Sequence, residues 1–148
     1  MRIAIVEDED YYAEKLQEYL RRYTQDYGQE LDTSRYANGI SFLNNFKGQF
    51  DLILLDISMP MIDGMETAKR IRSTDPDVVI LFVTNMAQYA IRGYEVDALD
   101  YILKPISYFP FSQRLNRAIS RVKSRSRHYL VVTTKNGTKK LDVASINT

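Results

Sequence analysis

The segment "LILLDISMPMIDGME", residues 52–66, decides the fold of this chain. Its first four residues are all apolar, which is typical of a strand that is buried on both faces of a sheet. This run ends in a carboxylate, Asp56, just before a stretch of turn residues. A carboxylate at the end of a buried strand loses part of its hydration, so other groups should meet it there.

Four further runs have the same strand-like character, and helical patterns separate them. The predicted strands cover residues 3–6, 31–36, 52–55, 78–83 and 99–103. Helices are predicted from near Tyr12, near Ile40, from about Asp63, over residues 87–93, and from about Pro110. The inward face of the last helix should consist of Phe111, Leu115, Ala118, Ile119 and Val122. Five β-α units in sequence predict an α/β fold with a five-stranded parallel sheet between helices. The doubly wound strand order 2-1-3-4-5 is the topology we expect.

The composition is that of one ordinary globular domain, with room for the beginning of a second. Of the 148 residues, 45% are hydrophobic and 26% are charged. No cysteine is present, which excludes disulfides and thiolate metal sites. The longest apolar run, residues 78–83, is too short to cross a bilayer, and the N-terminus has no signal-peptide pattern. We therefore expect a cytoplasmic protein without a membrane partner.

The net charge of +1 conceals an uneven distribution along the chain. Residues 1–120 hold 13 basic against 18 acidic side chains, whereas residues 121–148 hold seven basic against one acidic. The acidic part is predicted to be the folded domain. The basic part is predicted to be a linker followed by something else.

Polar side chains follow four of the five predicted strands. They are Glu7 and Asp8 after the first strand, Asp56 after the third, Thr84 after the fourth and Lys104 after the fifth. Ligands of open parallel sheets gather at the carboxyl ends of the strands, so these side chains should meet at one edge. Three carboxylates in one pocket repel each other and need a cation, and oxygen ligands without cysteine favour Mg²⁺. With an ammonium and a hydroxyl beside it, such a pocket suits phosphoryl transfer onto Asp56.

Each of these residues alone has an ordinary structural explanation, since an Asp after a strand often caps a helix. The joint pattern at four strand ends favours the functional interpretation. A phosphohydrolase with an aspartyl nucleophile is one alternative that would also use Mg²⁺. Such an enzyme normally carries a second Asp two residues after the nucleophile, where this chain has Ser58.

Four motifs resemble those of response-regulator receiver domains, the second component of two-component signalling. They are "IVEDED", "LILLDISMPMIDGME", "LFVTN" and "DYILKPI", in this order, and the resemblance covers residues 1–121. It implies a flavodoxin-like fold and a phosphoprotein in which Asp56 accepts a phosphoryl group from a sensor histidine kinase. It also implies that Asp8, Asp56 and the backbone carbonyl of Ser58 are Mg²⁺ ligands, with Glu7 binding through water.

The same resemblance implies a conformational switch beside the acceptor. Thr84 would be the switch hydroxyl, Lys104 the phosphate-binding amine, and Pro105 would follow a cis peptide bond. Tyr101 fits the aromatic switch position, and a half-buried strand aromatic is an equally ordinary explanation for it. Such a domain is no enzyme beyond its own phosphorylation and slow dephosphorylation. Phosphorylation is expected to favour a symmetric homodimer through the fourth helix, fifth strand and fifth helix.

The stretch "TNMAQYAIRGYEVDALDYILKPI", residues 84–106, is similar to the receivers of LytTR-type transcription regulators, whose second domain binds DNA. Residues 1–121 would then be the receiver, residues 122–128 a basic linker, and residues 129–148 the truncated start of the DNA-binding domain. In this last part, Asn136-Gly137 between two β-rich runs predicts a hairpin.

This chain alone is expected to bind DNA weakly if at all, because nearly all of the presumed DNA-binding domain is missing from it. Any contact would come from the basic residues 121–127 and would fade with salt. The remaining alternative is a stand-alone receiver that acts through protein contacts or as a phosphate sink.

Overall fold

A computed structural model describes the backbone of residues 1–89 and 91–135 and the side chains of residues 1–89 and 91–125. Its strands are β1 (Arg2–Val6), β2 (Asp32–Tyr36), β3 (Leu52–Leu55), β4 (Val79–Thr84) and β5 (Asp100–Leu103). They form one parallel sheet in the order β2-β1-β3-β4-β5. The predicted sheet and its strand order are confirmed.

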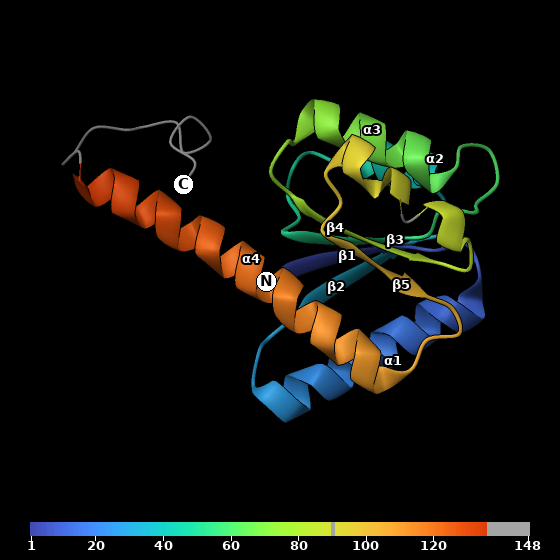
Figure 1. Cartoon of the computed structure of the whole chain (residues 1–148), viewed down its shortest axis with the longest axis horizontal. Helices are drawn as coiled ribbons and strands as arrows, with labels where there is room; N and C mark the ends of the chain where they lie inside the picture. The colour runs from blue at the N-terminus through green and yellow to red at the C-terminus, as the bar shows by residue number, and fades with distance from the viewer. Residues whose placement is uncertain (90, 136–148) are drawn as a thin grey trace.

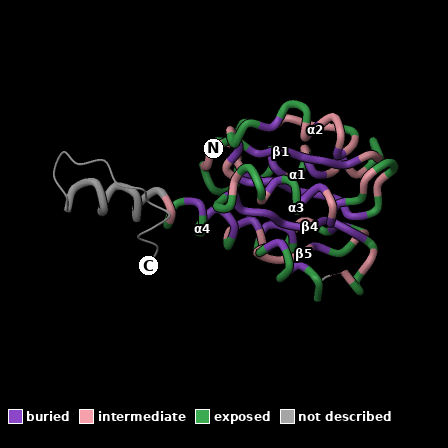
Figure 2. The backbone as a smooth tube through the Cα atoms, turned by 90° about the horizontal axis from the view of Figure 1, so that it is seen from above, coloured by how far each residue is buried: buried purple, intermediate pink, exposed green. Residues whose placement is uncertain are grey.

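Helices cover both faces of this sheet (Figure 1). One face carries α1 (Asp10–Tyr27) and α4 (Tyr108–Lys135), and the other carries α2 (Gly39–Asn45), α3 (Gly64–Thr74) and the 3₁₀ segments η1 (Ala87–Tyr89) and η2 (Ile91–Val96). Alternate residues of a strand enter different cores: Ile3 packs toward α1 and α4, and Ala4 toward α2 and α3. Figure 2 shows the buried strands between helices with exposed outer surfaces. This two-sided burial explains why the strands are unbroken apolar runs.

The short helix predicted over residues 87–93 is instead the pair of 3₁₀ segments η1 and η2. Gly93 lies inside η2 and disfavours a regular helix, because glycine loses more conformational entropy than other residues on becoming helical. Short 3₁₀ pieces are common connectors of this kind. Val96, the last residue of η2, is buried in the core on the side of α3.

Arg72, near the end of α3, ties the end of η2 to the start of β4. Its guanidinium donates hydrogen bonds to the backbone carbonyls of Val96 (2.7 Å), Asp97 (3.1 Å) and Val78 (2.6 Å). Val78 immediately precedes β4, so Arg72 acts at the amino edge of the sheet. That edge is opposite to the one at which the strand-end carboxylates lie.

The last helix, α4, is longer than predicted. It packs on the sheet through the predicted residues, which are Phe111, Leu115, Ala118, Ile119 and Val122, and it then extends past the sheet (Figure 1). Residues 122–128, predicted as a basic linker, continue this helix, and the strand predicted from residue 129 is wrong up to Lys135. A helix satisfies its backbone hydrogen bonds within one segment, whereas a strand needs a partner and a packed layer. The predicted turn at Asn136-Gly137 and the second arm of the hairpin lie outside the described residues.

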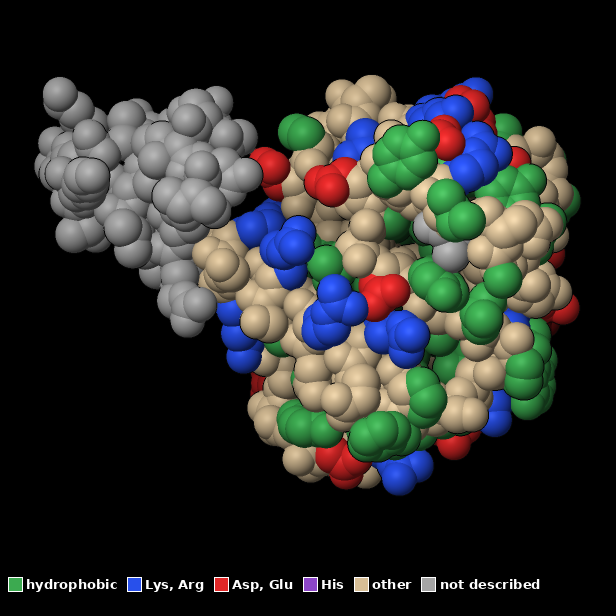
Figure 3. All heavy atoms as spheres, viewed as in Figure 1, with side chains coloured by type: hydrophobic (Ala, Val, Ile, Leu, Met, Phe, Trp, Pro, Cys, Tyr) green, Lys and Arg blue, Asp and Glu red, His purple; other side chains and the backbone are tan. Residues whose placement is uncertain are grey.

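Charged side chains join α4 to β5 on the face that Figure 3 shows, where basic groups surround an acidic one. Arg114 Nε and Arg117 Nη1 of α4 lie 3.7 and 2.5 Å from Asp100 Oδ2 of β5. These ion pairs hold α4 against the edge strand. Among the described residues, no helix combines the length and the apolar character that crossing a membrane requires.

Candidate metal and phosphoryl site

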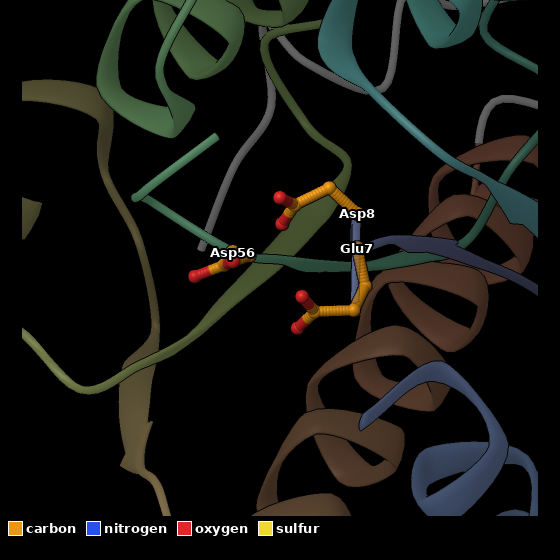
Figure 4. A group of neighbouring side chains, drawn as sticks. All are labelled: Glu7, Asp8 and Asp56. Atoms are coloured by element: carbon orange, nitrogen blue, oxygen red, sulfur yellow. The ribbon is translucent and has the colours of Figure 1, made fainter. Parts of the chain in front are cut away.

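Three carboxylates converge at the carboxyl edge of the sheet (Figure 4). Glu7 and Asp8 follow β1, and Asp56 follows β3, the neighbour of β1 in the sheet. One carboxylate oxygen from each residue lies within 4.8 Å of the others. Glu7 and Asp56 are only 1% and 2% exposed, whereas Asp8 is more open to solvent. The structure thus brings together the three carboxylates that the sequence places at strand ends.

The backbone around Asp56 is held from two sides. Its N–H donates to the carbonyl of Val6 at 3.0 Å, which continues the β1–β3 pairing to the acidic residues. On the other side, Gly64 at the start of α3 donates its N–H to the carbonyl of Ile57 at 2.8 Å. A Cβ on Gly64 would lie 2.2 Å from the carbonyl oxygen of Asp56, so only glycine permits this close approach.

Lys104 places its ammonium among the carboxylates. Nζ lies 2.9 Å from Glu7 Oε1, 3.3 Å from Asp56 Oδ2 and 3.3 Å from Glu9 Oε2. It also lies 4.2 Å from the centre of the Tyr12 ring, within the range of a cation–π interaction. The Lys104 side chain is only 3% exposed, and the Lys104–Pro105 peptide bond is cis.

The electrostatics of this pocket disfavour two negative charges side by side. Burial, reinforced by the charge of Asp56, raises the pKa of Glu7 to about 8. Burial likewise raises the pKa of Asp56 above its ordinary value, although Lys104 opposes the shift. Burial alone would lower the pKa of Lys104, but its contact with Glu7 and the charge of Asp56 outweigh this effect and raise it. A second cation in the pocket would therefore favour the ionised form of both carboxyl groups.

The oxygen atoms present fit a hard divalent cation such as Mg²⁺. Asp8 Oδ1 and Asp56 Oδ1 are buried and have no hydrogen-bond partner within the described part of the chain. Unpartnered carboxylate oxygens are costly when buried unless a cation or a donor meets them. Mg²⁺ prefers oxygen ligands and retains several waters, which suits a site that is open on the Asp8 side. Ser58 is exposed two residues after Asp56, in the loop that would offer the predicted backbone carbonyl.

The two predicted switch residues take no part in the ion pairs of the pocket. Thr84 at the end of β4 is fully buried, and its carbonyl accepts a hydrogen bond from the backbone N–H of Lys104 at 2.9 Å. Its hydroxyl oxygen accepts a hydrogen bond from the N–H of Met86 at 3.1 Å. Tyr101 pairs with Phe82 in the ladder and is partly buried against the core on the side of α2 and α3.

Two contacts of Lys104 were missed in the sequence analysis. Glu9 belongs to the acidic run "EDED", and Tyr12 was named only as the approximate start of the first predicted helix. Glu9 is the N-cap of α1 and Tyr12 lies in its first turn, shortly after the end of β1. The length of the acidic run was the one signal that could have pointed to Glu9.

A family model described as the response regulator receiver domain matches residues 3–120 of the chain. This chain belongs to that family. The match includes the sheet, apart from the first residue of β1, and the acidic pocket at its carboxyl edge.

Similar proteins include curated transcription and signalling regulators. The sensory transduction protein LytT of Oceanobacillus iheyensis is 41% identical over 83 residues, which cover 54% of this chain and 34% of that protein. The transcriptional regulatory protein RprY of Bacteroides fragilis is 30% identical over 127 residues, which cover 84% of this chain and 52% of that protein. The chain thus aligns with about a third to a half of the length of these relatives.

A similar solved structure is that of the response regulator protein TrrA from Thermotoga maritima in complex with Mg²⁺-BeF. It is 29% identical, with a TM-score of 0.69, over 79% of this chain and 97% of that one. This likeness extends over about four fifths of the chain and shows that it has the receiver fold.

Proposed function

We propose that this chain is the receiver of a two-component response regulator and accepts a phosphoryl group on Asp56 in a Mg²⁺-dependent reaction. The observation that carries this proposal is the position of Asp56: buried, 3.3 Å from the ammonium of Lys104, and within one acidic cluster with Glu7 and Asp8. A carboxylate in that place is oriented by the protein and faces a cation that can neutralise phosphoryl oxygens.

The transfer step uses the carboxylate of Asp56 as the nucleophile. One Asp56 oxygen forms a bond to phosphorus, while the bond between phosphorus and the donor breaks and the donor keeps the electron pair. The donor would be the phosphohistidine of a sensor kinase or a small acyl phosphate. When bound, Mg²⁺ supplies charge neutralisation for the phosphoryl oxygens. Asp8, Asp56 and the carbonyl of Ser58 would hold it directly, and Glu7 through water.

Mass spectrometry of the intact protein tests this function. Treatment with acetyl phosphate and Mg²⁺ should add one phosphoryl group to the parent chain and none to Asp56→Asn. Asp51→Asn is a matched control, because it removes another carboxylate. Asp51 lies at the amino edge of the sheet, where its carboxylate accepts a hydrogen bond from the backbone N–H of Arg2. This control should label like the parent. Equal labelling of Asp56→Asn, or labelling that a chelator does not reduce, would contradict the proposal.

Phosphorylation would act as a switch through the neighbouring strand ends. A phosphoryl group brings about two negative charges and three acceptor oxygens, which Thr84 and Lys104 would bond. Inward movement of Thr84 would leave space that Tyr101 could fill. The surface of η2, β5 and α4 would then change shape and favour a symmetric homodimer.

The output of the full-length regulator would be control of transcription through a DNA-binding domain of the LytTR type. The similarity to LytT supports this, although that alignment covers only 83 residues. Under this proposal, residues 1–121 are the receiver and residues 129–148 begin the output domain.

This chain alone should bind DNA weakly and without sequence preference, and its affinity should fall steeply as the salt concentration rises. A gel-shift titration measures this. A tight, salt-resistant complex with one sequence would contradict it.

A further inference from the structure

Arg35 of β2 contacts the loop that carries the acidic residues of the site. Its Nε and Nη2 both donate hydrogen bonds to the backbone carbonyl oxygen of Glu7, at 3.1 and 2.8 Å. Its Nη1 donates to Asp10 Oδ1 at 2.9 Å. Asp8, whose carboxylate faces the pocket, lies in the chain between these two anchored positions.

The register of the sheet explains why Arg35 reaches this loop. Arg35 lies opposite Ile5 in the β1–β2 ladder, two residues before Glu7. The carbonyl oxygen of Tyr36, the next residue of β2, accepts a hydrogen bond from the backbone N–H of Glu7 at 3.0 Å. Strand β2 therefore holds the main chain of Glu7 at two points. The Tyr36 carbonyl binds the N–H of Glu7, and the Arg35 side chain binds the C=O of Glu7.

The carbonyl of Glu7 belongs to the peptide unit that leads into Asp8. Fixing this carbonyl fixes the plane of the Glu7–Asp8 peptide, and this plane contains the N and Cα atoms from which the Asp8 side chain leaves the backbone. Hydrogen bonds from a guanidinium are charge-assisted and stronger than neutral ones, and its fork allows two to converge on one oxygen. The contact to Asp10 adds little by itself, because that side chain is 84% exposed.

We propose that Arg35 is a positioning residue for the Mg²⁺ site, holding the Asp8 carboxylate in the direction that binding requires. The inference rests on the proposed function, since it assumes that Asp8 binds the cation. Arg35 does not touch the pocket oxygens. It acts through the backbone that carries them, as outer residues of metal sites commonly do.

A role through charge and a role through positioning predict opposite changes in Mg²⁺ affinity when Arg35 is replaced by a neutral residue. As a charge alone, the guanidinium repels Mg²⁺, so the neutral variant Arg35→Met should bind the cation more tightly than the parent. As a positioning group, it supports binding, so Arg35→Met should bind more weakly. Arg35→Lys keeps the charge and most of the stem but has no planar fork, so it should also bind more weakly.

The experiment measures the Mg²⁺ dissociation constant of the whole 148-residue chain by isothermal titration calorimetry, with MgCl₂ as the only ligand, and urea unfolding of each variant. Both Arg35 variants are expected to bind about tenfold more weakly, the usual effect of losing an outer-shell partner. Arg72→Lys is the matched control, because Arg72 is also bound to backbone carbonyls but at the amino edge of the sheet. It should lower stability and leave the dissociation constant unchanged.

The outcomes separate this inference from the function on which it rests. If the parent binds Mg²⁺ and both Arg35 variants bind equally well, or Arg35→Met binds more tightly, the inference is wrong and the proposed function stands. If Arg72→Lys weakens binding as much as Arg35→Lys at similar loss of stability, the effect is general loosening and the inference is also wrong. If the parent itself binds no Mg²⁺, the proposed function fails and the inference fails with it.

Discussion

Lys104 and Asp56 form a buried ion pair, with Nζ and Oδ2 3.3 Å apart, although 48 positions separate them in the chain. The strands that precede them are not neighbours, because β4 lies between β3 and β5. The lysine side chain therefore crosses the carboxyl end of β4 to reach the acidic pocket. A phosphoryl group on Asp56 would enter a place where the protein already holds an ammonium.

Removal of this ammonium should destabilise the fold in a pH-dependent way. Lys104→Met leaves Glu7 and Asp56 buried without an internal cation, and breaking a buried pair in this way costs about 3 kcal/mol. The loss in the free energy of unfolding should be larger near pH 8 than near pH 5, because protonation removes the uncompensated charge at the lower pH. Urea unfolding in the presence of a chelator measures both values. The exposed Lys69→Met on α3 serves as the control and should change stability little at either pH.

The raised pKa of Glu7 predicts how the stability of the metal-free parent depends on pH. Its folded-state pKa is about 8 against an ordinary value of 4.5, so between these values the folded state holds a proton that the unfolded state has released. The free energy of unfolding should therefore fall as pH rises from about 5 to about 8. Glu7→Gln should flatten this slope and be more stable than the parent near pH 8. Added Mg²⁺ should stabilise the parent most at the alkaline end, since it binds the ionised site. A parent whose stability rises over this range would contradict the prediction.

Much of the fold and of the site could be predicted because both depend on strand ends. Unbroken apolar runs identify strands buried on two faces, and parallel strands bring their carboxyl ends to one edge. Glu7, Asp8, Asp56 and Lys104 could therefore be placed together from residues far apart in the chain. This argument fixes the edge at which a side chain lies, but not its contacts. Thr84 accordingly lies at the predicted strand end, while its hydroxyl accepts a bond from Met86.

Features that depend on packing between elements could not be predicted in this way. Nothing in the local pattern of β2 distinguishes Arg35 as a contact of the acidic loop, because that contact follows from the β1–β2 register. The β-branched residues after residue 129 indicated a strand, yet local propensity is weak against the continuation of a helix that is already packed. Gly93 similarly looked compatible with one short helix, and the chain forms two 3₁₀ segments there instead.

Gly64 is predicted to be irreplaceable because of crowding. In Gly64→Ala the new methyl group would lie 2.2 Å from the carbonyl oxygen of Asp56 and 2.6 Å from the Cα of Ile57, so α3 or the Asp56 backbone must shift. We expect a loss of about 3 kcal/mol in the free energy of unfolding, together with weaker labelling of Asp56 by acetyl phosphate. Gly28→Ala is the matched control: its φ is +71° and no atom lies within 4 Å, so only backbone strain of about 1 kcal/mol is expected. Urea unfolding and intact mass compare the two variants. A smaller loss for Gly64→Ala than for Gly28→Ala would show that the backbone yields without cost.

Thr84 is predicted to couple phosphorylation to association. Its side chain is fully buried at the end of β4, beside the Lys104 backbone, so its loss should not remove any group from the acidic pocket. Thr84→Ala should therefore still take up one phosphoryl group from acetyl phosphate with Mg²⁺. It should lose the hydroxyl that would bond the phosphoryl oxygens, and with it the bias toward the active conformation, which need be only a few kcal/mol. Sedimentation velocity with and without phosphorylation should then show a phosphorylation-dependent dimer for the parent and a monomer for the variant. Thr74→Ala, at the end of α3, is the control and should dimerise like the parent. If phosphorylated Thr84→Ala dimerises as readily as the parent, the hydroxyl is not the relay, and the switch lies elsewhere.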